Sequence, residues 1–417
     1  MKLYKDIRFS TITLSYFNSK MVELCFWLLL FSFQILVLTG LKPHYFLVTA
    51  ISLIIFVINL QPYINVLKSI YFLPLFTSIL YHVLFNRNID LAFILSILNY
   101  VIIPLVFFHR SFYSFDLYKS VYCFKWFTVL CFVGLMLQIV GVEAPFLDLE
   151  FAITDGIVKH RYGSIAGSTL VLGFFTSISF IYCFYNYIYL KDSSKQNIVF
   201  LIISLISLFL AQSRRYYVFT FIICALIFYF GKTKRTSLKY FFSKYKYYLI
   251  SILLFFLIAF FLKDDVFLFA RFYSTFDYKN DASNVLRAIK WIEAILNFVH
   301  HFWFGAGIGN MGAVGKNVSE LTPEELTVAE SYYLKVFVEG GIFFGLAFVV
   351  LIVNTLKRTF ILLKHNSSYS FVCYIFLFFF LDCFMSMTLE YVIGSILFWI
   401  SIAIINNPLI IKNNQYL

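Results

Sequence analysis

Residues 331–355 read SYYLKVFVEGGIFFGLAFVVLIVNT, a stretch dominated by apolar side chains. A transmembrane helix needs about 20 consecutive, mostly apolar residues. Similar stretches recur along the whole chain, and twelve of them are predicted as membrane spans. They lie at residues 21–39, 45–60, 70–85, 91–108, 122–142, 165–190, 197–212, 216–230, 247–262, 331–355, 369–386 and 390–406. We therefore predict an all-α polytopic membrane protein with about 12 transmembrane helices, in a single integral-membrane domain over residues 1–417.

The composition excludes a soluble fold. Hydrophobic residues make up 61% of the 417 residues and charged residues only 13%, against roughly 45–50% and 25% in soluble globular chains. Too few polar side chains remain to cover the surface of two or three soluble domains. The net charge of +12 could indicate nucleic-acid binding, but the basic residues fall between the apolar stretches and form no continuous patch. No nucleic acid is expected as a partner.

Lysine and arginine are unequally divided between the two sets of loops. If the N-terminus is cytoplasmic, the inner loops contain most of them, including Lys232, Lys234 and Arg235. The excess of positive charge on cytoplasmic loops then predicts that both termini lie in the cytoplasm. Two outer loops are longer than a connection requires, at residues 143–164 and 263–330.

The longer outer loop contains a predicted helix at residues 284–302 with two different faces. Its apolar stripe consists of Val285, Ile289, Ile292, Leu296 and Val299. Another side carries Arg287, Lys290, Trp291, Ala294, Asn297 and His301. Such a helix lies at the membrane surface or on the transmembrane bundle.

A glycine-rich stretch, Gly305-Ala306-Gly307-Ile308-Gly309, follows this helix. Glycine tolerates conformations that other residues avoid, so the stretch predicts a close turn or a re-entrant loop in which the backbone can approach a ligand. Further along, Thr322-Pro323-Glu324-Glu325 predicts the start of a new helix that leads to Glu330 at the mouth of the next span.

Cations gather near the outer ends of the predicted spans: Arg161, Arg214, Arg215, Arg271 and Arg287. Arg214 and Arg215 lie in a four-residue turn between two spans, against the usual distribution of positive charge. They could contact lipid phosphates of the outer leaflet. Alternatively, they could form a pocket for a lipid-linked phosphate or pyrophosphate, because a guanidinium group matches phosphate oxygens bidentately.

Acidic residues occur at membrane depth or close to it: Glu330, Glu339, Asp382 and Glu390. Ionisable groups in membrane segments are candidates for function, although each could simply pair with a cation, and this is the favoured interpretation of Glu339. The sequence has no metal-ligand spacing, no phosphate-binding loop and no D-x-D pair. We therefore expect no metal and no cofactor, and any chemistry must use Arg, Glu, Asp, His and Tyr side chains.

Four short motifs occur in order between residues 150 and 345. They are Arg161-Tyr162-Gly163-Ser164; Gln212-Ser213-Arg214; Arg287 to Trp291 followed by Trp303 to Gly309; and Ala329-Glu330-Ser331-Tyr332-Tyr333-Leu334 followed by Glu339, Gly341 and Gly345. Together with twelve spans and one large outer loop, this order resembles the O-antigen polymerase and O-antigen ligase superfamily of bacterial inner-membrane glycosyltransferases. Ligases of this superfamily usually carry His-Asn where this chain has Glu330-Ser331, and that difference favours a polymerase.

The resemblance implies a C-type glycosyltransferase-like fold and a specific reaction. Undecaprenyl-pyrophosphate-linked oligosaccharide repeat units, as donor and acceptor, are polymerised into O-antigen, a surface polysaccharide, at the periplasmic face of the inner membrane. Because pyrophosphate is the leaving group, the enzyme needs no metal. The lipid bilayer surrounds the protein, and a chain-length regulator and a flippase are the expected protein partners in lipopolysaccharide biosynthesis.

The resemblance also assigns roles to individual residues. Arg214 and Arg287 stabilise the pyrophosphate, and Glu330 activates the acceptor hydroxyl, so these three are the expected catalytic residues. Substrate binding is assigned within the same motifs to Arg161, Lys290, Trp291, Tyr332 and Tyr333. We add Arg215 and Asp382, which lie near the outer ends of predicted spans but outside these motifs. For Glu330 a second interpretation stays open, in which it forms only an ion pair that positions Arg287 or Arg214.

Two other functions are compatible with the sequence. An O-antigen ligase would transfer the glycan to lipid A-core with almost the same site. A lipid-linked oligosaccharide flippase or transporter would account for the spans without catalysis, but such proteins usually have internal repeats, and none is visible in the sequence.

Overall fold

The computed structural model describes residues 20–39, 66–85, 91–107, 115–154, 157–231, 282–311, 329–365 and 369–407. The predicted spans at residues 45–60 and 247–262, the predicted helix start at 322–325 and Arg271 lie outside these residues. The chain divides into two compact units: unit 1 comprises Met1–Ser120 and Leu286–Leu417, and unit 2 comprises Val121–Val285. The single domain over residues 1–417 stays a prediction.

Unit 2 is built around one central helix. Its described elements are α8 (Tyr122–Ile139), β1 (Asp148–Thr154), β2 (Ile157–Ser164), α9 (Thr169–Ile188), α10 (Lys195–Leu210) and α11 (Arg214–Gly231). Helix α9 packs against α8, α10 and α11, and most of its side chains are buried. Small polar residues let the helices approach, as at Ser179 and Ser204, whose hydroxyl oxygens are 2.9 Å apart. Helix α9 begins at an N-cap, where Ser168 Oγ accepts a hydrogen bond from the Val171 backbone N–H.

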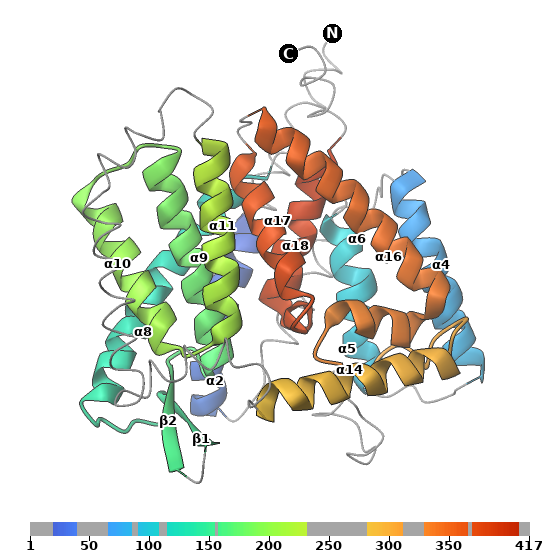
Figure 1. Cartoon of the computed structure of the whole chain (residues 1–417), viewed down its shortest axis with the longest axis horizontal. Coiled ribbons are helices and arrows are strands. Elements are labelled where there is room, and N and C mark those ends of the chain that lie inside the picture. Colours follow the sequence, from blue (N-terminus) through green and yellow to red (C-terminus); the bar gives the residue numbers. More distant parts are fainter. Residues whose placement is uncertain are drawn as a thin grey trace. The chain divides into compact units, whose positions relative to one another are not determined.

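Within the predicted outer loop at residues 143–164, the structure has an antiparallel hairpin of β1 and β2 (Figure 1). The all-α prediction did not include these strands. Ser164 ends the hairpin in a left-handed conformation with φ of 55° and is fully buried. Its Oγ donates to the Cys131 carbonyl (2.6 Å), and its N–H donates to Gln138 Oε1 (3.1 Å). These bonds fix the hairpin on α8 and lead the chain directly into α9.

Unit 1 combines helices from both ends of the chain. It contains the helix Lys20–Leu30, bent by 52° against α2 (Ser32–Thr39). The other described elements are α4 (Val66–Phe85), α5 (Leu91–Ile97), η1 (Leu98–Ile102), α6 (Ile103–Phe107), α7 (Leu117–Ser120), α14 (Ala282–His300), α16 (Tyr332–Lys364), α17 (Ser370–Asp382), η3 (Thr388–Glu390) and α18 (Val392–Ile405). Helix α14 begins within the last residues of unit 2.

The core of unit 1 is aromatic. Helix α18 is apolar on all sides and its side chains are all buried. Trp399 of α18 and Phe344 of α16 pack edge-on against Tyr71 of α4, with ring centroids 5.2 and 5.4 Å apart. All three side chains are buried. Because Tyr71 lies in the N-terminal part of unit 1 and Phe344 and Trp399 in the C-terminal part, their contact joins the two parts.

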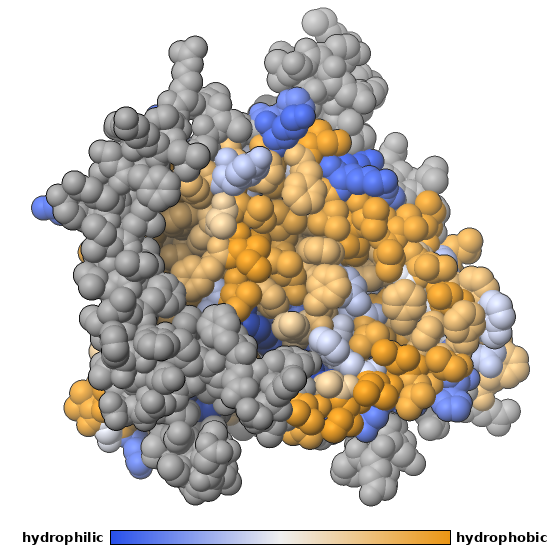
Figure 2. All heavy atoms as spheres, in the orientation of Figure 1, coloured by the Kyte–Doolittle hydropathy of each residue, from blue (hydrophilic) through white to orange (hydrophobic). Residues whose placement is uncertain are grey.

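Helix α16 is interrupted at Gly341, whose φ of 70° and ψ of −173° are not helical. Figure 1 shows that the short first segment of α16 and the long second segment run in different directions. Figure 2 shows apolar side chains covering the face of unit 1 on which α16 lies.

Four described helices are long and apolar enough to cross a membrane, namely Leu117–Ile139, Thr169–Ile188, Arg214–Gly231 and Tyr332–Lys364. The bent pair Lys20–Leu30 and Ser32–Thr39 would be a fifth. Shorter apolar helices lie at Ile70–Phe85, Ala92–Val106, Lys195–Leu210, Ser370–Asp382 and Val392–Ile405. This mostly helical architecture agrees with the all-α membrane class, while the number of twelve spans stays a prediction.

Candidate functional site

Helix α14 turns one face toward the interior of unit 1 and the other face away from it. The residues of the apolar stripe, Val285, Ile289, Ile292, Leu296 and Val299, are all exposed. On the opposite face Ala294 is fully buried, and Phe298 packs edge-on against Phe337 of α16 with centroids 5.5 Å apart. Figure 1 shows α14 lying across one end of unit 1. The inward face therefore combines the apolar Ala294 and Phe298 with the half-buried Arg287 and Lys290, while the apolar stripe faces outward.

Glu330 lies beside two cations of α14. Lys290 Nζ is 3.5 Å from Glu330 Oε1, and Arg287 Nε is 4.0 Å from Glu330 Oε2. Arg287 and Lys290 share one face of the helix because they are three residues apart. The three side chains are about equally exposed, at 29%, 36% and 32% for Arg287, Lys290 and Glu330. The cluster is thus half-buried, with a carboxylate and two cations that a ligand can reach.

The backbone around Glu330 is held by the turn that follows α17. The Tyr332 N–H donates to the carbonyls of Cys383 (2.9 Å) and Ser386 (3.1 Å), and Ser331 Oγ donates to the Cys383 carbonyl (3.3 Å). Glu330 itself has φ of 50°, a conformation that is uncommon for residues other than glycine. The surrounding contacts must therefore maintain this conformation.

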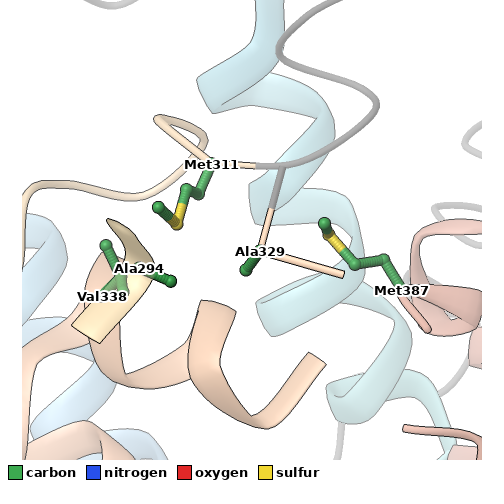
Figure 3. Close-up of a cluster of buried hydrophobic side chains, with 5 residues drawn as sticks. All are labelled: Ala294, Met311, Ala329, Val338 and Met387. Carbon is green, nitrogen blue, oxygen red and sulfur yellow. The ribbon is translucent and has the colours of Figure 1, made fainter. Parts of the chain in front are cut away.

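A small apolar cluster joins the segments that form the site. It consists of Ala294, Met311, Ala329, Val338 and Met387, with Phe298, Ala306 and Leu334 packed against it. Figure 3 shows Met311, Ala294 and Val338 grouped on one side and Ala329 and Met387 on the other. These residues come from α14, the end of the glycine-rich loop, the segment before α16, α16 itself and the turn before α18. The cluster fixes the distance between α14 and Glu330.

The glycine-rich loop enters the break in α16. The Ala306 N–H donates to the Val338 carbonyl (2.7 Å) and the Gly307 N–H to the Glu339 carbonyl (3.2 Å). In return the Ile342 N–H donates to the Phe302 carbonyl (2.8 Å). These bonds satisfy backbone groups that the interruption of the helix leaves without their usual partners. The predicted close turn is present, and its backbone lies against that of α16. The approach of this backbone to a ligand stays a prediction.

Beneath this loop lies a buried ion cluster. Lys335 Nζ is 3.5 Å from Glu339 Oε1 and forms a close ion pair with Glu390 of η3. All three side chains are at most 5% exposed. Glu339 Oε1 also accepts a hydrogen bond from the Met311 N–H (3.0 Å) at the end of the glycine-rich loop. The favoured interpretation of Glu339, an ion pair with a nearby cation, agrees with this geometry.

In unit 2, the predicted arginines lie near the start of α9. Arg161 lies on β2, opposite Glu150 in the strand register. The predicted tight turn lies between α10 and α11, and Arg214 is the first residue of α11. Arg215 lies over the ring of Tyr216, at 4.7 Å from its centroid, and donates to Tyr216 Oη (3.0 Å). Tyr216 and Ser213 pack closely against Gly173 in the first turns of α9. The convergence of these arginines with Arg287 of unit 1 stays a prediction.

A family model described as O-Antigen ligase matches residues 199–350. The match supports membership of the O-antigen polymerase and ligase superfamily. It covers Arg214 on α11, Arg287 and Lys290 on α14, and Glu330, whereas Arg161 on the hairpin lies before it. Members of this superfamily are glycosyltransferase-like enzymes, both ligases and polymerases. No curated protein matches the sequence.

The remaining residues suggested by the likeness to the superfamily lie around the start of α16. Tyr332 is buried against Tyr100 and Phe348, so its ring belongs to the core. Tyr333 Oη donates to the Phe380 carbonyl (3.1 Å), and Asp382 is fully buried at the end of α17. Trp291 is half-buried on α14. The structure thus brings Arg287, Lys290 and Glu330 into one cluster, while Tyr332 and Tyr333 support the segment that follows it.

Lys335 is absent from the residues expected from the superfamily motifs, although the sequence contains a signal for it. It is a cation within an apolar span, four residues before Glu339, and such pairs face each other on a helix. Its second partner, Glu390, is remote in sequence, and only the fold brings the two together. Among the described residues, no three His, Cys, Asp or Glu side chains form a group able to hold a metal ion.

Proposed function

We propose that this protein is an O-antigen polymerase, a glycosyltransferase that extends undecaprenyl-pyrophosphate-linked oligosaccharides at the periplasmic face of the bacterial inner membrane. The superfamily match supports glycosyl transfer in general. The observation that carries the specific proposal is the cluster of Glu330 with Arg287 and Lys290. It offers a proton acceptor next to cations that suit a phosphate group, which are the two functions this transfer requires.

The reaction joins one lipid-linked oligosaccharide to another. The hydroxyl oxygen of the acceptor sugar forms a bond to the anomeric carbon of the donor, and the bond from that carbon to the pyrophosphate oxygen breaks. Glu330 takes the hydroxyl proton. The undecaprenyl pyrophosphate leaves with the bonding electrons, and Arg287 and Arg214 stabilise its developing charge. Arg161, Arg215 and Lys290 assist in binding the pyrophosphate, and the half-buried Trp291 contacts the rest of the substrate. Tyr332, Tyr333 and Asp382, which were expected to bind substrate, instead support the backbone that follows Glu330, because Tyr332 and Asp382 are buried and the Tyr333 hydroxyl is bonded to the Phe380 carbonyl.

The exposed apolar face of α14 supports the place of this reaction at the membrane surface. Lipid contact on the stripe that includes Ile292, which is 58% exposed, would keep Arg287 and Lys290 at the height of the lipid phosphates. In that position a donor with a polyprenyl tail reaches the cations without leaving the bilayer. With both termini in the cytoplasm, this surface is periplasmic, where a flippase delivers the substrate and a chain-length regulator acts.

A ligase is the second candidate, favoured by the description of the matching family. The residues Glu330-Ser331, in place of the His-Asn of many ligases, favour the polymerase. Purified protein incubated with a synthetic undecaprenyl-pyrophosphate-linked repeat unit separates the two. A polymerase forms a ladder of longer lipid-linked glycans from this substrate alone, whereas a ligase forms product only when lipid A-core is added.

Deletion of the gene distinguishes all three functions in the cell. Electrophoresis of lipopolysaccharide should show a single repeat unit on the core. Bare core with accumulated polymer would indicate a ligase instead. Bare core with precursor held at the cytoplasmic face would indicate a flippase.

A further inference from the structure

The buried cluster of Lys335, Glu339 and Glu390 connects three segments that are separate in the sequence. Lys335 and Glu339 lie on the first segment of α16, Glu390 on η3 before α18, and Glu339 binds the Met311 N–H of the glycine-rich loop. Lys335 is only five residues beyond Glu330. We propose that Lys335 is a positioning residue, whose ion pairs with Glu339 and Glu390 lock these segments together and so hold Glu330 beside Arg287 and Lys290.

The path from Lys335 to Glu330 is short and can be followed bond by bond. The Lys335 N–H donates to the Ser331 carbonyl (3.0 Å), so the ion cluster lies one helical turn from the site. On the other side, the turn that leads to Glu390 accepts both hydrogen bonds of the Tyr332 N–H, through the carbonyls of Cys383 and Ser386. Met387 of the same turn packs in one cluster with Ala329. Movement of Glu390 would therefore move the backbone on both sides of Glu330.

The three charged residues of the cluster should differ in how much their removal destabilises the fold. One ammonium group faces two carboxylates in a site from which water is excluded. Without Lys335 two buried carboxylates would lose their cation, which is strongly unfavourable. Without either glutamate, one neutral ion pair remains. Variants of Glu390 or Glu339 should therefore fold, and they are suited to testing the proposal, whereas Lys335→Met should accumulate poorly.

The role in positioning rests on the proposed function of Glu330, but the geometry can be tested without any turnover. The seven cysteines are all buried, so Glu330→Cys provides one reachable thiol at the site. The measurement is the rate at which a soluble maleimide labels this thiol in the purified full-length protein in detergent. Glu390→Ala, added to this background, should raise the rate about tenfold, and Glu390→Gln, which can still accept a bond from Lys335, about threefold. Ser401→Ala is the matched control, because among the described residues this buried hydroxyl on α18 bonds within its own helix, to the Leu397 carbonyl (2.7 Å).

The outcomes separate the positioning role from simple stability. A merely structural role would lower the yield and the melting temperature but leave the labelling rate of the folded protein at the level of the Ser401→Ala control. A rate for Glu390→Ala within about twofold of that control would overturn the proposal. If Glu390→Ala does not stay monodisperse, Glu390→Gln and Glu339→Gln decide the question, because each retains a neutral pair with Lys335.

Activity with Glu330 intact provides an independent second measurement. Glu390→Ala should lower kcat for transfer while the KM for the lipid-linked donor stays within about twofold, because the cations that bind the donor remain. If the labelling rate responds as expected but the unmodified protein transfers no sugar, the proposed function fails and the positioning role stands. If the protein transfers sugar and the labelling rate does not respond, the positioning role alone fails.

Discussion

Gly305 and Gly341 meet in a backbone contact that leaves no room for a side chain on either residue. A Cβ atom on Gly305 would overlap the Glu339 carbonyl, and one on Gly341 would overlap the Trp303 carbonyl. Both residues also have positive φ, at 80° and 70°. The contact holds the glycine-rich loop in the break of α16, and so the two glycines determine the arrangement of the whole site.

Gly305→Ala should destabilise unit 1 and move the glycine-rich loop out of the break in α16. The positive φ alone costs about 1–3 kcal/mol, and the overlap with the Glu339 carbonyl adds to it. Gly141→Ala is the matched control: Gly141 has φ of 89°, but a Cβ atom added there would meet no atom within 4 Å beyond its chain neighbours. Thermal unfolding of the purified proteins followed by fluorescence should give a clearly larger decrease for Gly305→Ala. Equal decreases would mean that the close contact does not exist.

Glu330→Gln separates a proton acceptor from an ion-pair partner. If Glu330 takes the acceptor proton, the variant should lose at least about a hundredfold in kcat, while the lipid-linked donor still binds. If Glu330 only positions Arg287, donor binding should weaken together with turnover. Transfer assays with purified protein, combined with binding of fluorescent donor lipid, measure both quantities. Near-normal polymer formation would exclude Glu330 as the proton acceptor.

Arg287→Ala should nearly abolish polymer formation without affecting membrane insertion. A charge-assisted hydrogen bond to phosphate is worth roughly 1.5–3 kcal/mol, which corresponds to a loss of about tenfold to a hundredfold in kcat/KM. Arg287→Lys should recover only part of the activity, because lysine lacks the planar fork of donors. Full recovery by lysine would indicate that a point charge is sufficient. Full activity of the alanine variant would contradict the assignment of Arg287.

The exposed stripe of α14 should lie in lipid. A nitrobenzoxadiazole probe attached to Ile292→Cys should be quenched by spin-labelled lipids in reconstituted vesicles, because a helix of this kind buries its apolar face at the boundary of the acyl chains. His301→Cys is the control and should be quenched less, because His301 directly follows α14 and helical spacing places it on the side away from the stripe. Equal quenching at both positions would show that α14 does not lie along the membrane with this face toward it.

The predicted orientation can be tested within unit 2. Glu143 precedes the hairpin and Lys191 follows α9, and both residues are exposed. Because the single helix α9 separates the hairpin from the turn at Lys191, the two positions should lie on opposite sides of the membrane. A membrane-impermeant maleimide should label Glu143→Cys in cells with a permeabilised outer membrane, and Lys191→Cys only after lysis. The reverse result would place the proposed site in the cytoplasm.

Periodic patterns predicted several elements well. The apolar stripe around Ile292 predicted a helix at residues 284–302, and α14 lies at Ala282–His300. The turn at residues 212–215 was also predicted, and α10 ends at Leu210 shortly before α11 begins at Arg214. Both predictions depend on local sequence alone, which is why they required no knowledge of the rest of the fold.

Features that depend on contacts between distant segments were not predicted. The span expected at residues 331–355 is a longer helix, Tyr332–Lys364, broken at Gly341 by hydrogen bonds to the loop around Gly305. The second partner of Lys335, Glu390, lies on another segment, and nothing in the sequence around it indicates that it pairs with Lys335. The hairpin could have been found, because Leu149, Phe151 and Ile153 alternate with other residues at the period of a strand.

The division of the chain imposes an order on biosynthesis. Unit 2 is continuous in sequence, from Val121 to Val285, so its helices can pack while the ribosome is still translating the rest. Unit 1 can be completed only much later, because its parts are far apart in the sequence. For example, Ser78 Oγ donates to the Phe304 carbonyl (2.8 Å), a bond between residues 226 positions apart. Lys335 acquires its second carboxylate only when Glu390 has emerged. A nascent chain that ends before η3 would therefore contain all of unit 2 but only part of unit 1, so unit 1 is the part whose folding must wait for the end of translation.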